Sequence, residues 1–324
     1  MEATELRNIA PRSPSLDLYG LKAWPFRLTP DPVFYFDSRT HSEALRGLQS
    51  FVGRKEGLAL IYGDVGTGKT LLCRRFVEGL DRRVFNAGLI LNSEMTEKEF
   101  LAEALRAFDV TTHSHSTRAR MLETLRSLVK TEGERGKVSV LAVDEAQLLS
   151  DDLLELLARG SASWDEGGMS LRVALFAQEE LASRLVDRRM RRVRQRITVT
   201  HCLQPLSPDG IGAYLTHHLA AAGSLGVITF DKGALGRIYQ VSKGYGRIVN
   251  TVTGRCLLAL EGRSATVTWR IVDQVVRKHG AHASPGEEMA AKGRPGSVSL
   301  ALLLFALGLI LYGSFILLRP AFGF

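Results

Sequence analysis

Two patterns of apolar and polar positions follow one another along the chain. Between residues 58 and 203, short apolar runs alternate with segments of helical apolar spacing, which is typical of parallel strands joined by helices. The predicted strands are 58–62, 85–92, 137–143, 170–177 and 196–203. From Pro205 onward the pattern indicates only helices, near 208–222, 231–242, 246–261 and 268–279. The sequence therefore predicts an α/β fold, with a parallel five-stranded sheet covered by helices on both faces and a helical lid after it.

Helix-capping residues locate several connecting helices. Ser42 predicts the start of a helix that runs to about Arg54. Thr96 and Glu99 match a capping box, which predicts a helix that ends near residue 108. The arginine-rich segment 179–195 is predicted as one helix.

Composition divides the chain into six segments. The first is an N-terminal arm that mixes aromatic residues with prolines, a composition typical of extended chain packed on a domain. A stretch rich in Gly, Pro and small polar residues near the C-terminal end is typical of a linker. We expect an arm at 1–40, a core at 41–204, a lid at 205–280, a linker at 281–297, a membrane helix at 298–318 and a tail at 319–324.

The segment 298–318 contains 21 residues and no charged side chain. A helix of that length spans about 31 Å, which is the thickness of the hydrocarbon core of a bilayer. A buried core helix is the alternative. Basic residues precede the segment at Arg277, Lys278, Lys292 and Arg294, and only Arg319 follows it. The positive-inside rule therefore predicts a single-pass membrane protein with its N-terminal bulk in the cytoplasm.

Charge and cysteine content refine this picture. The formal net charge is +8, and six arginines lie between Arg188 and Arg196. Such a cluster suits phosphates, anionic lipid or a neighbouring subunit, and a solvated helix face is the alternative. Cys73, Cys202 and Cys256 have no metal-type spacing and indicate reduced thiols.

The string GDVGTGKT, from Gly63 to Thr70, follows a predicted strand and precedes a predicted helix. It fits the P-loop pattern, in which glycines let the backbone N–H groups point at the β- and γ-phosphates of a nucleotide. Lys69 would supply a positive charge to these phosphates, and the Thr70 hydroxyl would bind Mg²⁺. This motif, in this context, predicts ATP and Mg²⁺ as cofactors.

Acidic and amide side chains at two other strand ends complete the expected site. Asp144 ends an apolar strand, where its carboxylate can hold Mg²⁺, and Glu145 can deprotonate the attacking water. Two solvated acids at a strand end are the alternative. Gln178 ends the fourth strand, which we expect to lie between the P-loop strand and the Asp144 strand. Its amide can bond the attacking water or the γ-phosphate.

Arginines are expected at two further positions of the site. Arg194 and Arg196 precede the fifth strand, from where a guanidinium can reach the γ-phosphate of a neighbouring subunit. Arg196 is the preferred candidate, and one of the two is expected to brace the interface only. Arg247 begins a lid helix, where it can close over the phosphates.

The strings YGLKAWPFRLTPDPVFYF, GDVGTGKT, VDEAQLL, QRITVTHCLQPLS and GYGRIVN resemble those of the ExeA/GspA-type AAA+ ATPases of general secretion, and of relatives in MSHA pilus biogenesis and exosortase-linked polysaccharide systems. The similarity covers about residues 17–280. It implies a P-loop AAA+ core with Gln178 and Arg247 as sensors and a finger at Arg194 or Arg196. Tyr245 and Gly246 depart from the lid motif of the family. The nucleotide-binding set is then Gly63, Asp64, Val65, Gly66, Thr67, Gly68, Lys69, Thr70, Leu71 and Arg247.

The resemblance and the membrane segment predict a membrane-anchored, homo-oligomeric ATPase that drives or regulates assembly of an envelope secretion, pilus or polysaccharide export system. Its partners would be inner-membrane or envelope assembly proteins, and possible ligands include anionic lipid. The secretion members carry a periplasmic peptidoglycan-binding region after the membrane helix, and this sequence ends five residues past Arg319, so direct peptidoglycan contact is not expected. A DNA-associated ATPase resembling the TniB/MuB-type transposition regulators is the alternative, and a scaffold with negligible turnover is a third.

Overall fold

Five parallel strands form the central sheet of the computed structural model, in the order β2-β3-β4-β1-β5. The model describes residues 19–54, 57–113, 116–162, 170–224, 226–260 and 265–279. The strands are β1 (Leu58–Tyr62), β2 (Phe85–Ile90), β3 (Val138–Val143), β4 (Arg172–Ala177) and β5 (Ile197–Cys202). All five lie where the apolar runs predict them, and β4 lies between β1 and β3 as expected.

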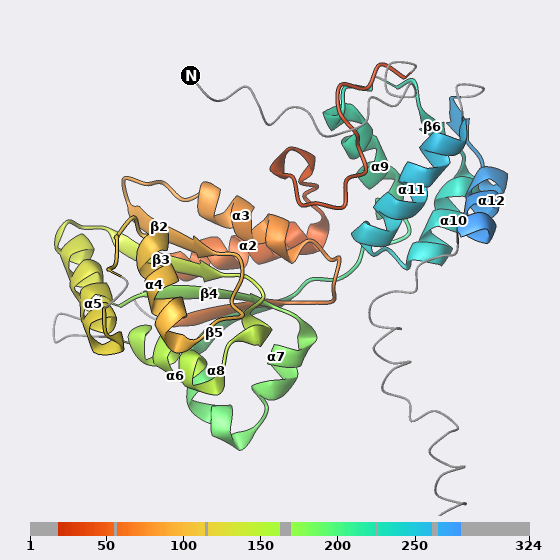
Figure 1. Cartoon of the computed structure of the whole chain (residues 1–324). Helices are drawn as coiled ribbons and strands as arrows, with labels where there is room; N and C mark the ends of the chain where they lie inside the picture. The colour runs from red at the N-terminus through yellow and green to blue at the C-terminus, as the bar shows by residue number, and fades with distance from the viewer. Residues whose placement is uncertain are drawn as a thin grey trace, which may run out of the picture. The chain divides into compact units, whose positions relative to one another are not determined.

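Helices cover both faces of this sheet (Figure 1). One face packs on α2 (Arg39–Val52) and α3 (Lys69–Glu78), through a core that includes Phe51, Phe76 and Phe176. The other face packs on a second group of helices, through a core that includes Phe100, Leu125 and Leu154. That group comprises α4 (Glu97–Ala107), α5 (Arg118–Glu134), α6 (Asp151–Gly160), α7 (Glu179–Arg184) and α8 (Arg191–Arg196).

Two predicted helices differ from the observed ones. α2 begins at Arg39 instead of after Ser42, because Ser38 caps it by accepting a hydrogen bond from the His41 backbone N–H. The predicted helix 179–195 is broken into α7, the 3₁₀ turn η3 (Arg188–Met190) and α8. α7 ends at Arg184, and Asp187 then begins a new turn by accepting the Arg189 N–H on its carboxylate. The capping box of Thr96 and Glu99 is present as predicted.

Four helices after the sheet form a separate hydrophobic core (Figure 1). They are α9 (Gly210–Ala221), α10 (Lys232–Ser242), α11 (Gly246–Leu260) and α12 (Trp269–His279). A short parallel pair, β6 (Thr229–Phe230) and β7 (Thr266–Val267), joins two of their connections. The sequence did not predict this pair, because two residues are too few to show a strand periodicity.

The buried side chains of the N-terminal arm belong to the core of these helices, whereas the partly buried Tyr35 packs against the core on one face of the sheet. Tyr19, Leu21, Phe26 and Phe34 are buried against α9 and α11, with Phe34 in the 3₁₀ turn η1 (Pro32–Phe34). The start and end of the described chain are therefore packed together. An aromatic, proline-rich sequence could predict an extended packed segment, but not the partner on which it packs.

The predicted linker 281–297, membrane helix 298–318 and tail 319–324 lie outside the described residues. Within the described ranges, no helix is both long enough and apolar enough to span a bilayer.

Candidate functional site

The P-loop connects β1 to α3 in a tight turn with glycines in left-handed conformations. Gly68 immediately precedes α3 with φ of +93°, a left-handed conformation that favours glycine. A Cβ at this position would lie 2.7 Å from Nε2 of His41, so a larger residue would displace that ring. Gly66 has φ of +84°, and a Cβ there would lie 3.1 Å from Cβ of Arg247. The two glycines therefore allow His41 and Arg247 to pack closely against the loop.

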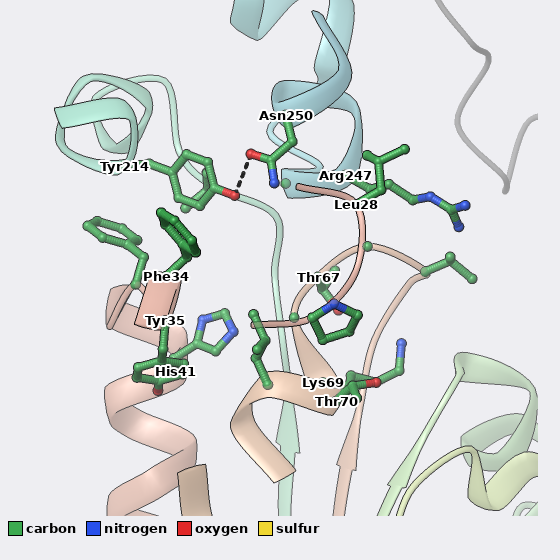
Figure 2. Close-up of a pocket in the computed structure, with 18 of the residues that line it drawn as sticks. Leu28, Phe34, Tyr35, His41, Thr67, Lys69, Thr70, Tyr214, Arg247 and Asn250 are labelled. Carbon is green, nitrogen blue, oxygen red and sulfur yellow. Dashed lines mark hydrogen bonds between the residues drawn. The ribbon is translucent and has the colours of Figure 1, made fainter. Parts of the chain in front are cut away.

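Lys69 is buried at the first position of α3, with 5% of its surface exposed. Its ammonium donates hydrogen bonds to the carbonyl oxygens of Gly63 and Asp64, each at 2.8 Å. Burial lowers the pKa of this ammonium, and the nearby Glu145 and Asp144 carboxylates oppose that effect. Figure 2 shows Lys69 beside Thr70 at the start of the helix. The loop thus places one cation at the helix N-terminus, where phosphates bind favourably.

Asp144 and Thr70 form the donor set expected for a divalent cation. The Thr70 hydroxyl hydrogen-bonds the Asp144 carboxylate, and burial raises the pKa of that carboxyl group. Asp144 is 2% exposed, and its Oδ1 atom has no hydrogen-bond partner among the described residues. An unsatisfied buried carboxylate oxygen is costly unless a ligand completes it. A carboxylate and a hydroxyl oxygen are ligands that Mg²⁺ prefers, so these residues fit that ion.

Glu145 follows in a left-handed conformation, with φ of +53°, which is rare for a residue other than glycine. Its carboxylate oxygen Oε2 accepts hydrogen bonds from Nε2 of Gln147, at 2.5 Å, and from Nε2 of Gln178, at 3.2 Å. Ser93 holds the Glu145 backbone by donating to its carbonyl oxygen at 2.7 Å. The two expected residues Glu145 and Gln178, which are 33 positions apart, are therefore in direct contact.

Gln147 is a site residue that the sequence analysis missed. Its side-chain oxygen accepts the backbone N–H of Gln178 at 3.0 Å, while its amide nitrogen bonds Glu145. Arg184 fixes the same turn by donating to the Gln147 carbonyl oxygen at 3.1 Å. Gln147 thus joins the ends of β3 and β4. Its position two residues after Glu145 was the one sequence signal that could have identified it as a site residue.

A pocket of about 360 Å³ opens beside the P-loop. The expected site residues that line it are Val65, Gly66, Thr67, Gly68, Lys69, Thr70, Leu71, Glu145, Gln178 and Arg247. The far wall consists of most of the arm residues between Pro25 and Phe36 and of residues from α9 and α11 (Figure 2). Gly63, Asp64 and Asp144 support the pocket from outside its lining. The arm residues were not predicted as part of the site, because their role depends on where the arm packs.

Aromatic rings and two polar contacts fasten the arm to α9 and α11. The His218 ring stacks near Phe34, with ring centroids 5.5 Å apart, and its Nδ1 lies 2.8 Å from the Pro25 carbonyl oxygen. Asn250 donates to the Arg27 carbonyl oxygen at 3.0 Å and accepts from the Tyr214 hydroxyl at 2.9 Å (Figure 2). Burial lowers the pKa of His218 to about 4, so its ring is neutral near pH 7.

His41 is a second buried histidine of the site and lies beneath the P-loop. Its Nδ1 lies 2.6 Å from the Ser38 hydroxyl, and its ring also hydrogen-bonds the Thr67 backbone. Only 8% of the residue is exposed, and burial lowers its pKa to about 4. A neutral imidazole therefore connects the start of α2 to the P-loop.

Comparison with known proteins assigns this arrangement to a family. The AAA domain family matches residues 52–185. Over 247 residues the chain is 32% identical to General secretion pathway protein A of Aeromonas hydrophila, an alignment that covers 76% of this chain. The chain belongs to the AAA+ ATPases related to that secretion protein. The expected resemblance to the ExeA/GspA type is confirmed, and membership of this ATPase family supports the expected ATP hydrolase activity. It spans about half (45%) of the length of this relative.

Solved structures support the fold. The ORC2 protein of Aeropyrum pernix matches with a TM-score of 0.62 and 16% identity, over 79% of this chain and 73% of that one. The RuvB Holliday junction branch migration motor of Thermotoga maritima matches with a TM-score of 0.54 and 18% identity, over 88% of this chain and 86% of that one. At such identities the likeness shows the shared AAA+ fold alone.

The two arginines predicted as fingers of this ATPase lie away from its own pocket. Arg196 is exposed at the amino end of β5, beside the start of β1, whereas the P-loop follows the carboxyl end of β1. Arg194 donates to the carbonyl oxygen of Val186 at 3.0 Å. Neither side chain lines the pocket of the same chain.

Proposed function

We propose that the chain is a membrane-anchored AAA+ ATPase that uses ATP to drive or regulate assembly of a bacterial envelope secretion, pilus or polysaccharide export system. The observation that carries the proposal is the contact of Glu145 with Gln178 beside the P-loop, in a chain 32% identical to a secretion protein. The charge-free segment 298–318 supplies the anchor in the inner membrane, with the ATPase core (41–204) and lid (205–280) in the cytoplasm.

Each residue near the P-loop has a distinct role in this proposal. Lys69 and the loop N–H groups bind the β- and γ-phosphates. Thr70 and Asp144 hold Mg²⁺, which neutralises charge on the phosphates when bound. Glu145 accepts a proton from the attacking water, and Gln178 orients that water through the same hydrogen-bond network. Arg247 closes over the phosphates from α11.

Arg196 serves the nucleotide of a neighbouring copy, with Arg194 bracing the turn that presents it. The support is their distance in the sheet from their own P-loop and their exposed position. An arginine supplied by a neighbour accelerates phosphoryl transfer about 10³–10⁵-fold in known cases. This role requires a homo-oligomer.

A mixing experiment tests the shared site. Lys69→Ala chains and Arg196→Ala chains are each expected to be inactive alone, because one lacks the phosphate-binding cation and the other the finger. Mixed oligomers contain some sites with an intact Lys69 and a neighbouring intact Arg196, so phosphate release should partly return. Mixtures as inactive as the separate variants would exclude a finger supplied by a neighbour.

A trapping experiment tests the envelope role. The Glu145→Gln chain, tagged and solubilised from membranes with ATP and Mg²⁺, should co-purify with inner-membrane or secretin-type proteins that mass spectrometry identifies. Lys69→Ala is the matched control, because it should not enter the ATP-bound state. Recovery of recombinase-like proteins and nucleic acid, which dissociate at high salt, would oppose the envelope role.

A second candidate function, a DNA-associated ATPase, is favoured by one groove of the structure. The groove has a volume of about 800 Å³ and lies between α5, α6 and α8. Its charged lining residues are Glu155 and five arginines, Arg118, Arg126, Arg159, Arg192 and Arg196. Guanidinium groups bind phosphates well, but among the described residues no aromatic side chain lines the groove on which bases could stack.

Charge reversal in this groove tests the DNA function. Arg126→Glu combined with Arg192→Glu should weaken binding of a labelled DNA duplex and reduce its salt dependence by about one unit for each phosphate that the groove no longer neutralises. Arg39→Glu is the control, because Arg39 is exposed at the start of α2, on the other face of the sheet. Equal, weak binding by the wild-type chain and both variants would exclude a DNA site in the groove.

A further inference from the structure

The turn before α11 lies directly against the P-loop. Gly244 is held by a hydrogen bond from the Leu206 N–H to its carbonyl oxygen at 2.9 Å. A Cβ at Gly246 would lie 3.4 Å from the Gly66 carbonyl oxygen, and a Cβ at Gly66 would lie 3.1 Å from Cβ of Arg247. The backbones of two segments that are far apart in the sequence therefore meet at van der Waals distance.

A side-chain hydrogen bond joins these two segments. The Tyr245 hydroxyl donates to Oδ2 of Asp64, the second residue of the P-loop. The Asp64 carbonyl oxygen accepts from Nζ of Lys69 at 2.8 Å and from the Thr67 hydroxyl at 2.8 Å. Asp64 is thus the residue through which the turn contacts the network that shapes the loop.

Tyr245 also forms backbone hydrogen bonds at the start of α11. Its carbonyl oxygen accepts the N–H groups of Ile248 and Val249, each at 2.9 Å, and so begins α11. This helix carries Arg247 and also Asn250, which holds the arm. A shift of Tyr245 relative to Asp64 would therefore move one whole wall of the pocket.

We propose that Tyr245 is a positioning residue for ATP binding, which holds the start of α11 on the P-loop by its bond to Asp64. The proposal rests on the assignment of the nucleotide to this pocket. Binding is the affected step, because the bond fixes the two walls relative to one another before ATP enters. The bond also occupies an oxygen of a carboxylate that carries negative charge close to the phosphate-binding loop. The chemistry at Glu145 is not affected.

A double-mutant cycle in the full chain tests this role. Tyr245→Phe removes the donor of the bond with little change of volume, and Asp64→Ala removes its acceptor. Each is expected to weaken the affinity for a fluorescent ATP analogue about five- to tenfold, as for loss of one intramolecular hydrogen bond of ordinary strength. The double variant should be no weaker than the weaker single variant, because the two residues act through one bond.

Steady-state kinetics separates positioning from chemistry. Tyr245→Phe should raise KM for ATP and leave kcat within about twofold, as for a residue that contributes only to binding. Tyr239→Phe is the matched control: Tyr239 is partly buried in the same helical core, and its hydroxyl has no hydrogen bond among the described residues. The control should change neither constant.

Three outcomes would overturn the proposal: unchanged affinity in Tyr245→Phe, additive losses in the double variant, or a fall in kcat alone. Failure of the pocket assignment gives a different result. If Lys69→Ala binds the analogue as tightly as the wild-type chain, then the nucleotide is elsewhere, and the proposal for Tyr245 fails with that assignment.

Discussion

The pocket has two walls that are built in different ways. The P-loop wall consists of residues 65–71 with Glu145 and Gln178, which follow the ends of adjacent parallel strands, and Asp144 supports it from outside the lining. The helical wall consists of arm residues 25–36 with α9 and α11, held together by ring packing and by bonds from His218 and Asn250. In the first wall the backbone topology places the side chains. In the second, contacts between the two ends of the described chain do so.

This difference implies that substitutions in the two walls change different properties of the protein. A change in the P-loop wall should alter chemistry or phosphate binding while the fold persists, because the sheet positions its residues. A change in the helical wall should alter stability and nucleotide affinity together, because the same contacts build both the wall and the core.

Glu145→Gln should have the largest effect. Loss of a general base lowers turnover about 10²–10⁴-fold. ATP affinity and the free energy of unfolding should stay near their wild-type values, since the amide keeps the volume of the side chain. Phosphate-release kinetics, equilibrium binding and denaturant unfolding measure the three quantities. Full turnover by the variant would show that Glu145 does not activate the water.

Phe34→Ala should show the opposite behaviour. Truncation of a buried phenylalanine costs about 3–5 kcal/mol of unfolding free energy, and Phe34 is 5% exposed. ATP affinity should fall with stability, while kcat at saturating ATP changes little. Val33→Ala is the matched control in the same turn, since Val33 is 67% exposed. Loss of kcat without loss of stability would contradict the distinction between the walls.

Asn250→Ala should have an intermediate effect. It removes the donor to the Arg27 carbonyl oxygen and the acceptor of the Tyr214 hydroxyl. Leaving such partly buried groups unpaired costs about 1–3 kcal/mol, and the arm should become more accessible to proteolysis near residue 27. A free energy of unfolding within about 0.5 kcal/mol of the wild-type value would mean that ring packing alone holds the arm.

The pH dependence of stability should be shared by both walls. His41 and His218 each have a pKa near 4 in the folded chain, against an ordinary value near 6.5. The unfolded chain therefore binds more protons as the pH falls from about 6.5 towards 4, so stability decreases in that window by up to ~1.4 kcal/mol per pH unit for each histidine. Above about pH 7 both are neutral in either state, and their contribution is constant.

Replacement of either histidine tests this expectation. Denaturant unfolding of His41→Asn and of His218→Asn between pH 4.5 and 7.5 should give a shallower decrease than in the wild-type chain, by about one proton in each case. A slope that changes for only one variant would show that the other histidine is protonated in the folded state.

The sequence alone determined the strands, the P-loop and the residues at the ends of β3 and β4. Apolar runs and glycine spacing express local backbone requirements, so they are readable without any tertiary contact. The sequence also predicted a parallel sheet from the alternation of strands and helices, with Gln178 between the P-loop strand and the Asp144 strand.

Only the tertiary structure decided the rest. It showed that Gln147 bridges Glu145 and Gln178, that the arm packs on α9 and α11, and that Tyr245 bonds Asp64. It also distributed the arginines of 188–196 between two short helical segments and joined some of them to arginines of α5 and α6 in one groove. These features depend on side chains that are distant in sequence and meet only after the chain has folded. Periodicity and spacing record local preferences, and they do not specify which distant surfaces come into contact.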